Sequence, residues 1–281
     1  MAGTALVLGG GGLTGIGWEI GVLAGLAEAG LDLADADVVI GTSAGSIVGA
    51  HLTSRHHTVE ELYEHQLAAP GKSRSAARMG PAALARFAAI ALRSRDTASF
   101  GARMGKLALG ARTVTEAEQR TVLARTLNLT DWPARRLLIT AVDAATGERT
   151  AFDDTSGVRL LDAVGASCAV PGIYPPVTID GTRWIDGGVH SSANADLAAG
   201  YGRVVVVAPM AASGGPIAGP RAQGEQLARR GARVCVLTPD RAARSAFGRN
   251  VLDPAKRADA ARAGRRQAAA HVARIRQVWS D

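Results

Sequence analysis

The chain begins with short apolar segments that end at glycines and are followed by amphipathic stretches. Ala5–Leu8 and Val38–Ile40 are apolar, and each ends at a glycine-containing turn. Helices are predicted over residues 15–29 and from about 44 to 53, because apolar positions recur there at helical spacing. Two successive strand–glycine turn–helix units predict parallel strands and an α/β fold.

Residues 59–130 favour several helices, interrupted by Gly71, Gly80-Pro81, Gly101 and Gly110. The remaining sequence predicts a strand over 137–142, a returning strand over 148–152, a helix over 160–167 and a hairpin over 177–185. It then predicts strands over 204–208 and 234–238 and a long basic helix over 254–278. We find no repeat and no linker. We therefore predict a single domain over residues 1–281, with a basic helical insertion at about 71–130.

The composition of the 281 residues, 47% apolar and 20% charged, is typical of a globular protein. No apolar run approaches the ~18 residues of a membrane span, and the N-terminus lacks the basic region of a signal peptide. Two cysteines give no disulfide framework, which favours a reducing, cytoplasmic location. No Cys/His spacing fits zinc, and we expect neither a metal nor a cofactor.

The net charge of +7 is concentrated in two basic blocks. Residues 71–112 carry nine Lys and Arg against one Asp, and residues 241–276 carry ten against two. Such blocks suit peripheral contact with an anionic membrane or a lipid headgroup, and equally a solvated helix surface. The basic, apolar segment 81–95 is either an interfacial lid or a helix packed on the core. Nucleic-acid binding is disfavoured, because only 4% of residues are aromatic and no recognition motif occurs.

A G-x-S-x-G sequence, Gly41-Thr42-Ser43-Ala44-Gly45, lies between a predicted strand and a predicted helix. A tight turn at this point strains the backbone of the serine, and glycines on either side relieve the crowding. The Ser43 hydroxyl is then lifted above the sheet near a helix N-terminus, where developing negative charge is favoured. Ser43 is therefore a candidate nucleophile, although an ordinary glycine turn has the same residues.

The glycine run Gly9–Gly12, followed by Gly15, has two interpretations. It fits the dinucleotide fingerprint G-x-G-x-x-G, with Asp35 20 residues beyond Gly15. Alternatively, the N–H groups of Gly10, Gly11 and Gly12 form an oxyanion hole. Asp35 precedes the second strand instead of closing it, and this disfavours the nucleotide interpretation of an oxidoreductase.

A serine nucleophile needs a base. The histidines are His51, His56, His57, His65, His190 and His271. Only His190 and His271 come late enough for a Ser-Asp-His order, and His271 lies in the basic helix, so His190 is the triad candidate. The other candidate base is Asp186, in Trp184-Ile185-Asp186-Gly187-Gly188. Its carboxylate ends a predicted strand, and the two glycines leave it free to approach Ser43.

Together, Gly10–Gly15, Gly41–Gly45 and Asp186–Gly188, in this order, resemble the patatin-like phospholipase family. The segment Ala166–Pro171 and the helix start Trp18–Leu23 are also similar, and the resemblance spans residues 5 to about 208. It implies a three-layer α/β/α sandwich with a mostly parallel sheet. It also implies a Ser43–Asp186 dyad without histidine, and hydrolysis of acyl esters, often of phospholipids or lysophospholipids.

Thr14 departs from the family, which usually carries Arg or Lys at this position. A hydroxyl replaces the cation that would help to hold the glycine loop, so the rate or the preferred acyl group is expected to differ. Three alternatives to a dyad lipase remain: a His190-dependent esterase, a nucleotide-binding oxidoreductase, and a catalytically weak or silent lipid-binding protein. The sequence predicts neither the natural substrate nor the oligomeric state.

Overall fold

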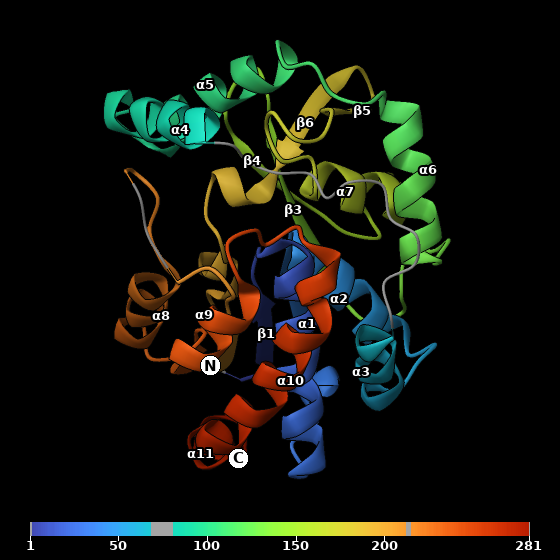
Figure 1. Ribbon diagram of the computed structural model, residues 1–281. Helices are drawn as coiled ribbons and strands as arrows, with labels where there is room; N and C mark the ends of the chain where they lie inside the picture. The colour runs from blue at the N-terminus through green and yellow to red at the C-terminus, as the bar shows by residue number, and fades with distance from the viewer. Residues whose placement is uncertain (1, 69–80, 212–214, 281) are drawn as a thin grey trace.

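The strands form one eight-stranded sheet in the order β5-β6-β3-β2-β1-β7-β8, with β4 also paired to β3 (Figure 1). The structure is a computed structural model that describes residues 2–68, 81–211 and 215–280. The strands are β1 (Thr4–Leu8), β2 (Val38–Thr42), β3 (Leu137–Asp143), β4 (Arg149–Phe152), β5 (Val177–Ile179), β6 (Thr182–Asp186), β7 (Arg203–Val207) and β8 (Arg233–Leu237). The five strands β8, β7, β1, β2 and β3 run parallel. The sheet is therefore mostly parallel, as predicted.

Helices cover both faces of this sheet (Figure 1). One face is covered by α1 (Gly12–Glu28), α2 (Ala44–Ser54), α7 (Leu160–Ser167), α10 (Arg257–Ala268) and α11 (Val272–Trp279). The other face is covered by the 3₁₀ turn η3 (Ala195–Ala198), α8 (Pro220–Arg229) and α5 (Thr97–Leu109). β1 and β2 are buried along their whole length, as expected for central parallel strands. These three layers confirm the predicted α/β/α sandwich.

The remaining helices are peripheral and are α3 (Val59–Leu67), α4 (Pro81–Arg93), α6 (Glu116–Leu127) and α9 (Arg241–Phe247). The predicted breaks at Gly71 and Gly80 lie outside the described residues. The predicted break at Gly101 is wrong, because Gly101 lies within α5. A Cβ there would lie 2.6 Å from the carbonyl oxygen of Gly147, so this glycine permits close packing instead of ending a helix.

The predicted single helix over 254–278 is divided into η4 (Pro254–Lys256), α10, η5 (Ala269–His271) and α11. Its small residues pack on α1 while its arginines Arg262 and Arg266 face solvent. The helices α8 and α9 were not expected from the sequence. No helix in the described parts of the chain is long and apolar enough to cross a bilayer.

The strands β2 and β6 pair with successive parts of the same side of β3, so that they lie end to end. Thr140 of β3 pairs with Thr42 of β2, and the next residue, Ala141, pairs with Asp186 of β6. The opposite edge of β3 is occupied by β4. Since β2 is parallel and β6 antiparallel to β3, the carboxyl ends of β2 and β6 meet. The two residues singled out in the sequence, Ser43 and Asp186, therefore meet where these strands end.

Candidate active site

Ser43 occupies a strained turn between β2 and α2. Its backbone has φ 52° and ψ −116°, a conformation that residues other than glycine rarely adopt. A Cβ on Gly45 would lie 2.1 Å from the carbonyl oxygen of Leu8, and a Cβ on Gly41 would lie 2.6 Å from Cα of Ser46. The two flanking glycines are therefore required for the turn that presents Ser43.

Asp186 lies directly opposite this serine. Ser43 Oγ donates a hydrogen bond of 2.7 Å to Asp186 Oδ2, and the Gly188 N–H donates one of 2.7 Å to Oδ1. The carboxylate is buried, with 5% of the residue exposed. Gly187 permits the approach of β3, since a Cβ there would lie 2.3 Å from Thr140 Oγ1. Both glycines after Asp186 thus shape its surroundings.

Burial sets the protonation of this carboxyl group. Desolvation raises the pKa of Asp186 to about 6, against the opposing effect of the hydrogen bonds from Ser43 and Gly188. The group is therefore ionised at neutral pH, while it is a much better proton acceptor than an ordinary aspartate. A pKa near the working pH is what general-base chemistry requires.

The glycine loop lies beside Ser43, but its three predicted donors are not equivalent. The Gly10 N–H donates to the carbonyl of Ser192 at 2.7 Å, so the expectation that it faces an oxyanion is corrected. Gly10 nevertheless lies beside Ser43, because a Cβ at Gly10 would lie 3.4 Å from Ser43 Cβ, an ordinary van der Waals contact. For the N–H groups of Gly11 and Gly12, at the start of α1, the described residues provide no acceptor. These two donors are free to meet a ligand.

Thr14 holds the loop from behind. Its N–H donates to the carbonyl of Val251 at 3.0 Å, and its hydroxyl lies 3.4 Å from the same oxygen. Thr14 is fully buried, and Gly15 packs against Pro209. The residue in the position of the family's usual cation therefore anchors the glycine loop to the segment after α9.

Three neighbours of Ser43 were not identified as site residues from the sequence. The Ser43 N–H donates to Ser167 Oγ at 2.8 Å, and Ser46 Oγ donates to the Ser43 carbonyl at 2.6 Å. Cys168 Sγ also lies 3.4 Å from that carbonyl. Burial raises the pKa of the Cys168 thiol to about 12, so the thiol stays neutral beside the carboxylate. The sequence of Ala166–Pro171 is similar to the family but indicates no role for these residues.

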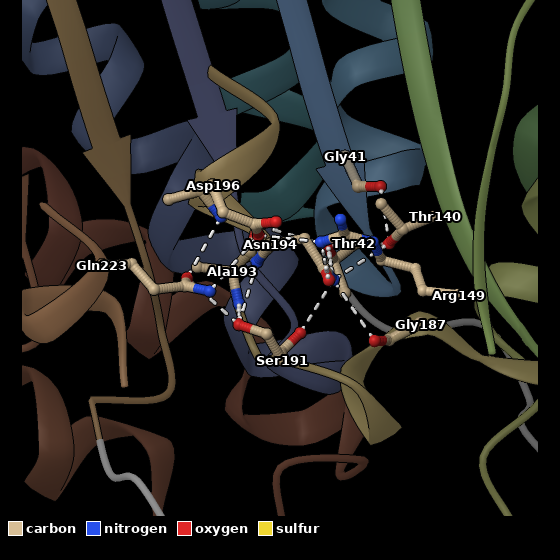
Figure 2. A network of polar contacts seen from close by, with 11 residues as sticks. Gly41, Thr42, Thr140, Arg149, Gly187, Ser191, Ala193, Asn194, Asp196 and Gln223 are labelled. Carbon is tan, nitrogen blue, oxygen red and sulfur yellow. Dashed lines mark hydrogen bonds and ion pairs between the residues drawn. The ribbon is translucent and has the colours of Figure 1, made fainter. Parts of the chain in front are cut away.

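A buried polar network connects the two sides of the site, and Asn194 lies at its centre (Figure 2). Asn194 Nδ2 lies 3.0 Å from Thr42 Oγ1, 3.2 Å from the Gly187 carbonyl and 2.8 Å from the Ser191 carbonyl. Thr42 precedes Ser43, and Gly187 follows Asp186. One side chain thus ties together the two backbone segments that carry the Ser43–Asp186 pair. No motif in the sequence indicated this role.

A narrow cavity opens beside Cys168, between α6, α7 and β5. Leu123, Leu161, Val177 and Tyr174 contribute to its walls. Its volume of about 20 Å³ is that of a single water, far less than an acyl chain occupies. The cavity by itself therefore does not define an acyl-chain site.

The histidine candidates lie elsewhere. In the described residues, no histidine nitrogen hydrogen bonds to Ser43 or Asp186. His190 is close to Arg149 and Asp196, and burial followed by the Arg149 charge lowers its pKa. The geometry gives no support to a His190-dependent triad.

The nucleotide interpretation also fails on geometry. Asp35 ends η1 (Leu33–Asp35), which precedes β2, and it pairs with Arg55 and Arg135. It therefore lies at the amino end of β2, whereas the glycine loop follows the carboxyl end of β1. An acid at the amino ends of the parallel strands cannot bind the ribose of a nucleotide held by a loop at their carboxyl ends.

An α/β/α sandwich with a strained serine turn, a facing carboxylate and a glycine loop defines the class of protein. A family model described as patatin-like phospholipase matches residues 6–199, more than half of the chain. The chain belongs to the patatin-like phospholipase family. No curated protein matches the sequence significantly.

Two solved structures are similar in fold. VipD from Legionella pneumophila matches with a TM-score of 0.48 and 13% identity, over 97% of this chain and 66% of the VipD chain. The type III effector protein ExoU matches with a TM-score of 0.43 and 14% identity, over 100% of this chain and 54% of the ExoU chain. The chain thus spans just under two thirds of VipD and about half of ExoU.

Proposed function

We propose that this protein is a lipid acyl hydrolase that cleaves carboxylic esters of phospholipids or lysophospholipids through a Ser43–Asp186 dyad. Membership of the patatin-like phospholipase family supports hydrolysis of lipid esters. The observation that carries the dyad is the 2.7 Å hydrogen bond from the strained Ser43 hydroxyl to a buried carboxylate. The pKa of that carboxylate, raised to about 6, suits it to accept the serine proton.

In the first half-reaction, Asp186 Oδ2 accepts the Ser43 proton while Oγ attacks the ester carbonyl carbon. The carbonyl oxygen becomes an oxyanion, which the Gly11 and Gly12 N–H groups stabilise at the N-terminus of α1. The C–O bond to the alcohol then breaks, and Asp186 returns the proton to the leaving alkoxide. The products of this step are the free alcohol and an acyl-Ser43 enzyme.

In the second half-reaction, water attacks the acyl-Ser43 ester and Asp186 accepts a proton from it. The same donors stabilise the second oxyanion, and Ser43 regains its proton as the fatty acid leaves. Gly41, Gly45, Gly187 and Gly188 shape the two turns, while Thr14 and Gly15 support the glycine loop. All chemical steps are thus assigned to residues that lie at one end of the sheet, where the parallel strands have their carboxyl ends.

The test compares wild type with Ser43→Ala, Asp186→Asn and His190→Ala on a soluble p-nitrophenyl ester and on lysophospholipid. Ser43→Ala and Asp186→Asn are expected to lose at least ~10³-fold in kcat/KM, because each removes a partner of the dyad. His190→Ala is expected to keep its activity. Full activity in Asp186→Asn together with loss in His190→Ala would overturn the dyad.

A folded wild type that binds fatty acid but turns over neither ester would instead support the silent lipid-binding alternative. Thr14→Arg is the variant that separates this outcome from an inactive preparation. Activity that appears on adding the family's cation would locate the defect in the glycine loop.

A further inference from the structure

The helix α4 is apolar on both of its long sides. Phe87, Ile90 and Ala91 face inward onto the cluster that surrounds Phe100 and Met104. On the opposite side, Ala85, Ala88 and Leu92 are exposed, and Leu92 is 87% exposed. A solvent-facing helix normally carries polar residues on its outer side. From residue 85 to residue 93, the only polar side chains of α4 are Arg86 and Arg93.

Exposed cations lie along one flank of α4 and on the neighbouring helix α5. Arg86 and Arg93 of α4, and Arg103 and Lys106 of α5, are exposed. None of the four forms an ion pair with a residue in the described ranges. The only acid between residues 81 and 112 is Asp96, whose carboxylate caps α5. The α4–α5 surface, meaning Ala85, Arg86, Ala88, Leu92, Arg93, Arg103 and Lys106, is therefore apolar and positive.

This surface lies on the same side of the molecule as Asp186. The helix α5 contacts β3, β6 and the turn η2 (Gly187–Val189) that directly follows Asp186. In Figure 1, α4 and α5 lie at the end of the molecule opposite the two chain termini. The helix α5 therefore lies next to the end of the sheet where β2 and β6 meet and where Ser43 and Asp186 are found.

We propose that the α4–α5 surface docks onto an anionic lipid bilayer, with α4 lying in the interface and Leu92 inserted among the acyl chains. An in-plane helix combines an apolar side with flanking cations, and α4 carries Arg86 and Arg93 along one flank of its apolar outer side. Each arginine near an anionic surface strengthens binding about fivefold, by the general scale for juxtamembrane cations. The inference rests on the proposed lipid-ester function only for the choice of bilayer as the partner.

The experiment measures co-sedimentation of the full chain carrying Ser43→Ala, so that no lipid is consumed. The vesicles are pure phosphatidylcholine, or phosphatidylcholine with about 30% phosphatidylglycerol. The variants are Arg86→Glu/Arg93→Glu and Leu92→Asp. The matched control is Arg229→Glu/Arg230→Glu, which reverses two exposed cations at the end of α8, next to the amino end of β8.

We expect binding to anionic vesicles that weakens as salt is raised, with little binding to phosphatidylcholine. Arg86→Glu/Arg93→Glu should lower the affinity roughly 25-fold or more. Leu92→Asp should also lose most of its binding. Arg229→Glu/Arg230→Glu should lose less than half as much as the α4 arginine pair, when both losses are expressed as logarithms of affinity. Equal losses in both pairs, or unchanged binding of the α4 variants, would overturn the proposal. So would a dimer in sizing experiments that Leu92→Asp dissociates.

Turnover of a soluble ester, measured in the same substitutions with Ser43 restored, keeps the two proposals separate. The α4 variants should hydrolyse it as wild type does, because they leave Ser43 and Asp186 untouched. Vesicle binding without any ester turnover would refute the proposed function alone. Turnover without specific vesicle binding would refute the docking surface alone.

Discussion

At the scale of single residues, the reactivity of the site depends on the proton of Asp186. Only the ionised carboxylate can accept the Ser43 proton, and burial raises the pKa of Asp186 to about 6. We therefore predict that kcat/KM for a soluble ester falls about tenfold per pH unit below pH ~6 and is level above it. A pH–rate profile between pH 4.5 and 8.5 checks this. An acid limb near the ordinary aspartate value would contradict it.

The same burial makes Asp186 a cost to stability at neutral pH. Its folded pKa, about 6, exceeds the usual 3.8, so the folded state binds the proton more tightly than the unfolded chain. The stability this provides is complete below pH 3.8 and is lost as the pH rises through 6. Asp186→Asn should therefore be more stable than wild type at pH 7.5, by up to about 3 kcal/mol. Denaturant unfolding at pH 7.5 and pH 4 measures the difference, which should fall below ~1 kcal/mol at the lower pH.

Asn194 is expected to position the dyad. Without its side chain, Thr42 and Gly187 are no longer joined, and the Ser43–Asp186 hydrogen bond weakens. That bond lowers the pKa of Asp186, so Asn194→Ala should move the acid limb of the pH–rate profile to higher pH and reduce kcat roughly 10²-fold. Gln223→Met, a change in the same network but farther from the dyad, should lower stability without moving the limb. An unmoved limb in Asn194→Ala would leave Asn194 a purely structural role.

The residues of the candidate site divide according to how local their roles are. Ser43 could be identified because its turn requires glycine at positions 41 and 45, and this requirement is visible in a segment of five residues. Asn194 could not be, because its partners Thr42 and Thr140 come from distant strands. The sequence also could not show that Gly10 is unavailable as an oxyanion donor. Its N–H donates to the carbonyl of Ser192, a residue that comes close only in the folded chain.

At the scale of elements, α1 packs closely against α10. A Cβ on Gly17 would lie 2.5 Å from the Arg257 carbonyl, and one on Gly21 would lie 2.0 Å from the Ala261 carbonyl. From α10, a Cβ on Gly264 would lie 2.3 Å from the Trp18 carbonyl. Glycines four residues apart therefore let the backbones touch along one side of α1, and this explains why the basic C-terminal helix is packed instead of free.

Gly21→Ala should force these two helices apart. We predict a loss of about 3 kcal/mol in the free energy of unfolding, at the upper end of typical overpacking costs. Gly110→Ala is the matched control, because Gly110 has negative φ and its nearest neighbour to a Cβ lies 3.5 Å away. The control should change stability by less than about 0.5 kcal/mol. Urea unfolding of both variants decides, and equal effects would refute the packing argument.

Elements with a strong local pattern were predicted well. The hairpin of β5 and β6 follows from Asp180-Gly181, whose φ angles of 48° and 78° suit a tight turn. The helix α7 matches the predicted range 160–167. The helices α8 and α9 were missed because each has a single large apolar residue, Leu227 in α8 and Phe247 in α9, so neither shows a clear apolar repeat.

At the scale of the whole molecule, the sheet extends beyond the part that matches the family. The match covers residues 6–199, yet β7 pairs with β1 along its length and β8 pairs with β7. The helix α10 also covers the glycine side of α1. Parallel pairing of this kind joins residues about 200 positions apart, which local sequence patterns cannot indicate.

A fragment of residues 1–202 should therefore not fold as a monomer. It would leave one edge of β1 unpaired and the inner side of α1 exposed, and both features promote aggregation. We predict aggregation or the absence of a cooperative unfolding transition, measured by sizing and thermal melts beside the full chain. A soluble, cooperatively folded fragment would show that the family-matched part is an independent unit.

Activation of Ser43 by Asp186 is tested by labelling with a fluorophosphonate probe and mapping the modified peptide. We predict modification of Ser43 in wild type and in His190→Ala, none in Ser43→Ala, and a loss of at least ~10²-fold in rate in Asp186→Asn. Labelling of Ser43 that persists unchanged in Asp186→Asn and disappears in His190→Ala would contradict it.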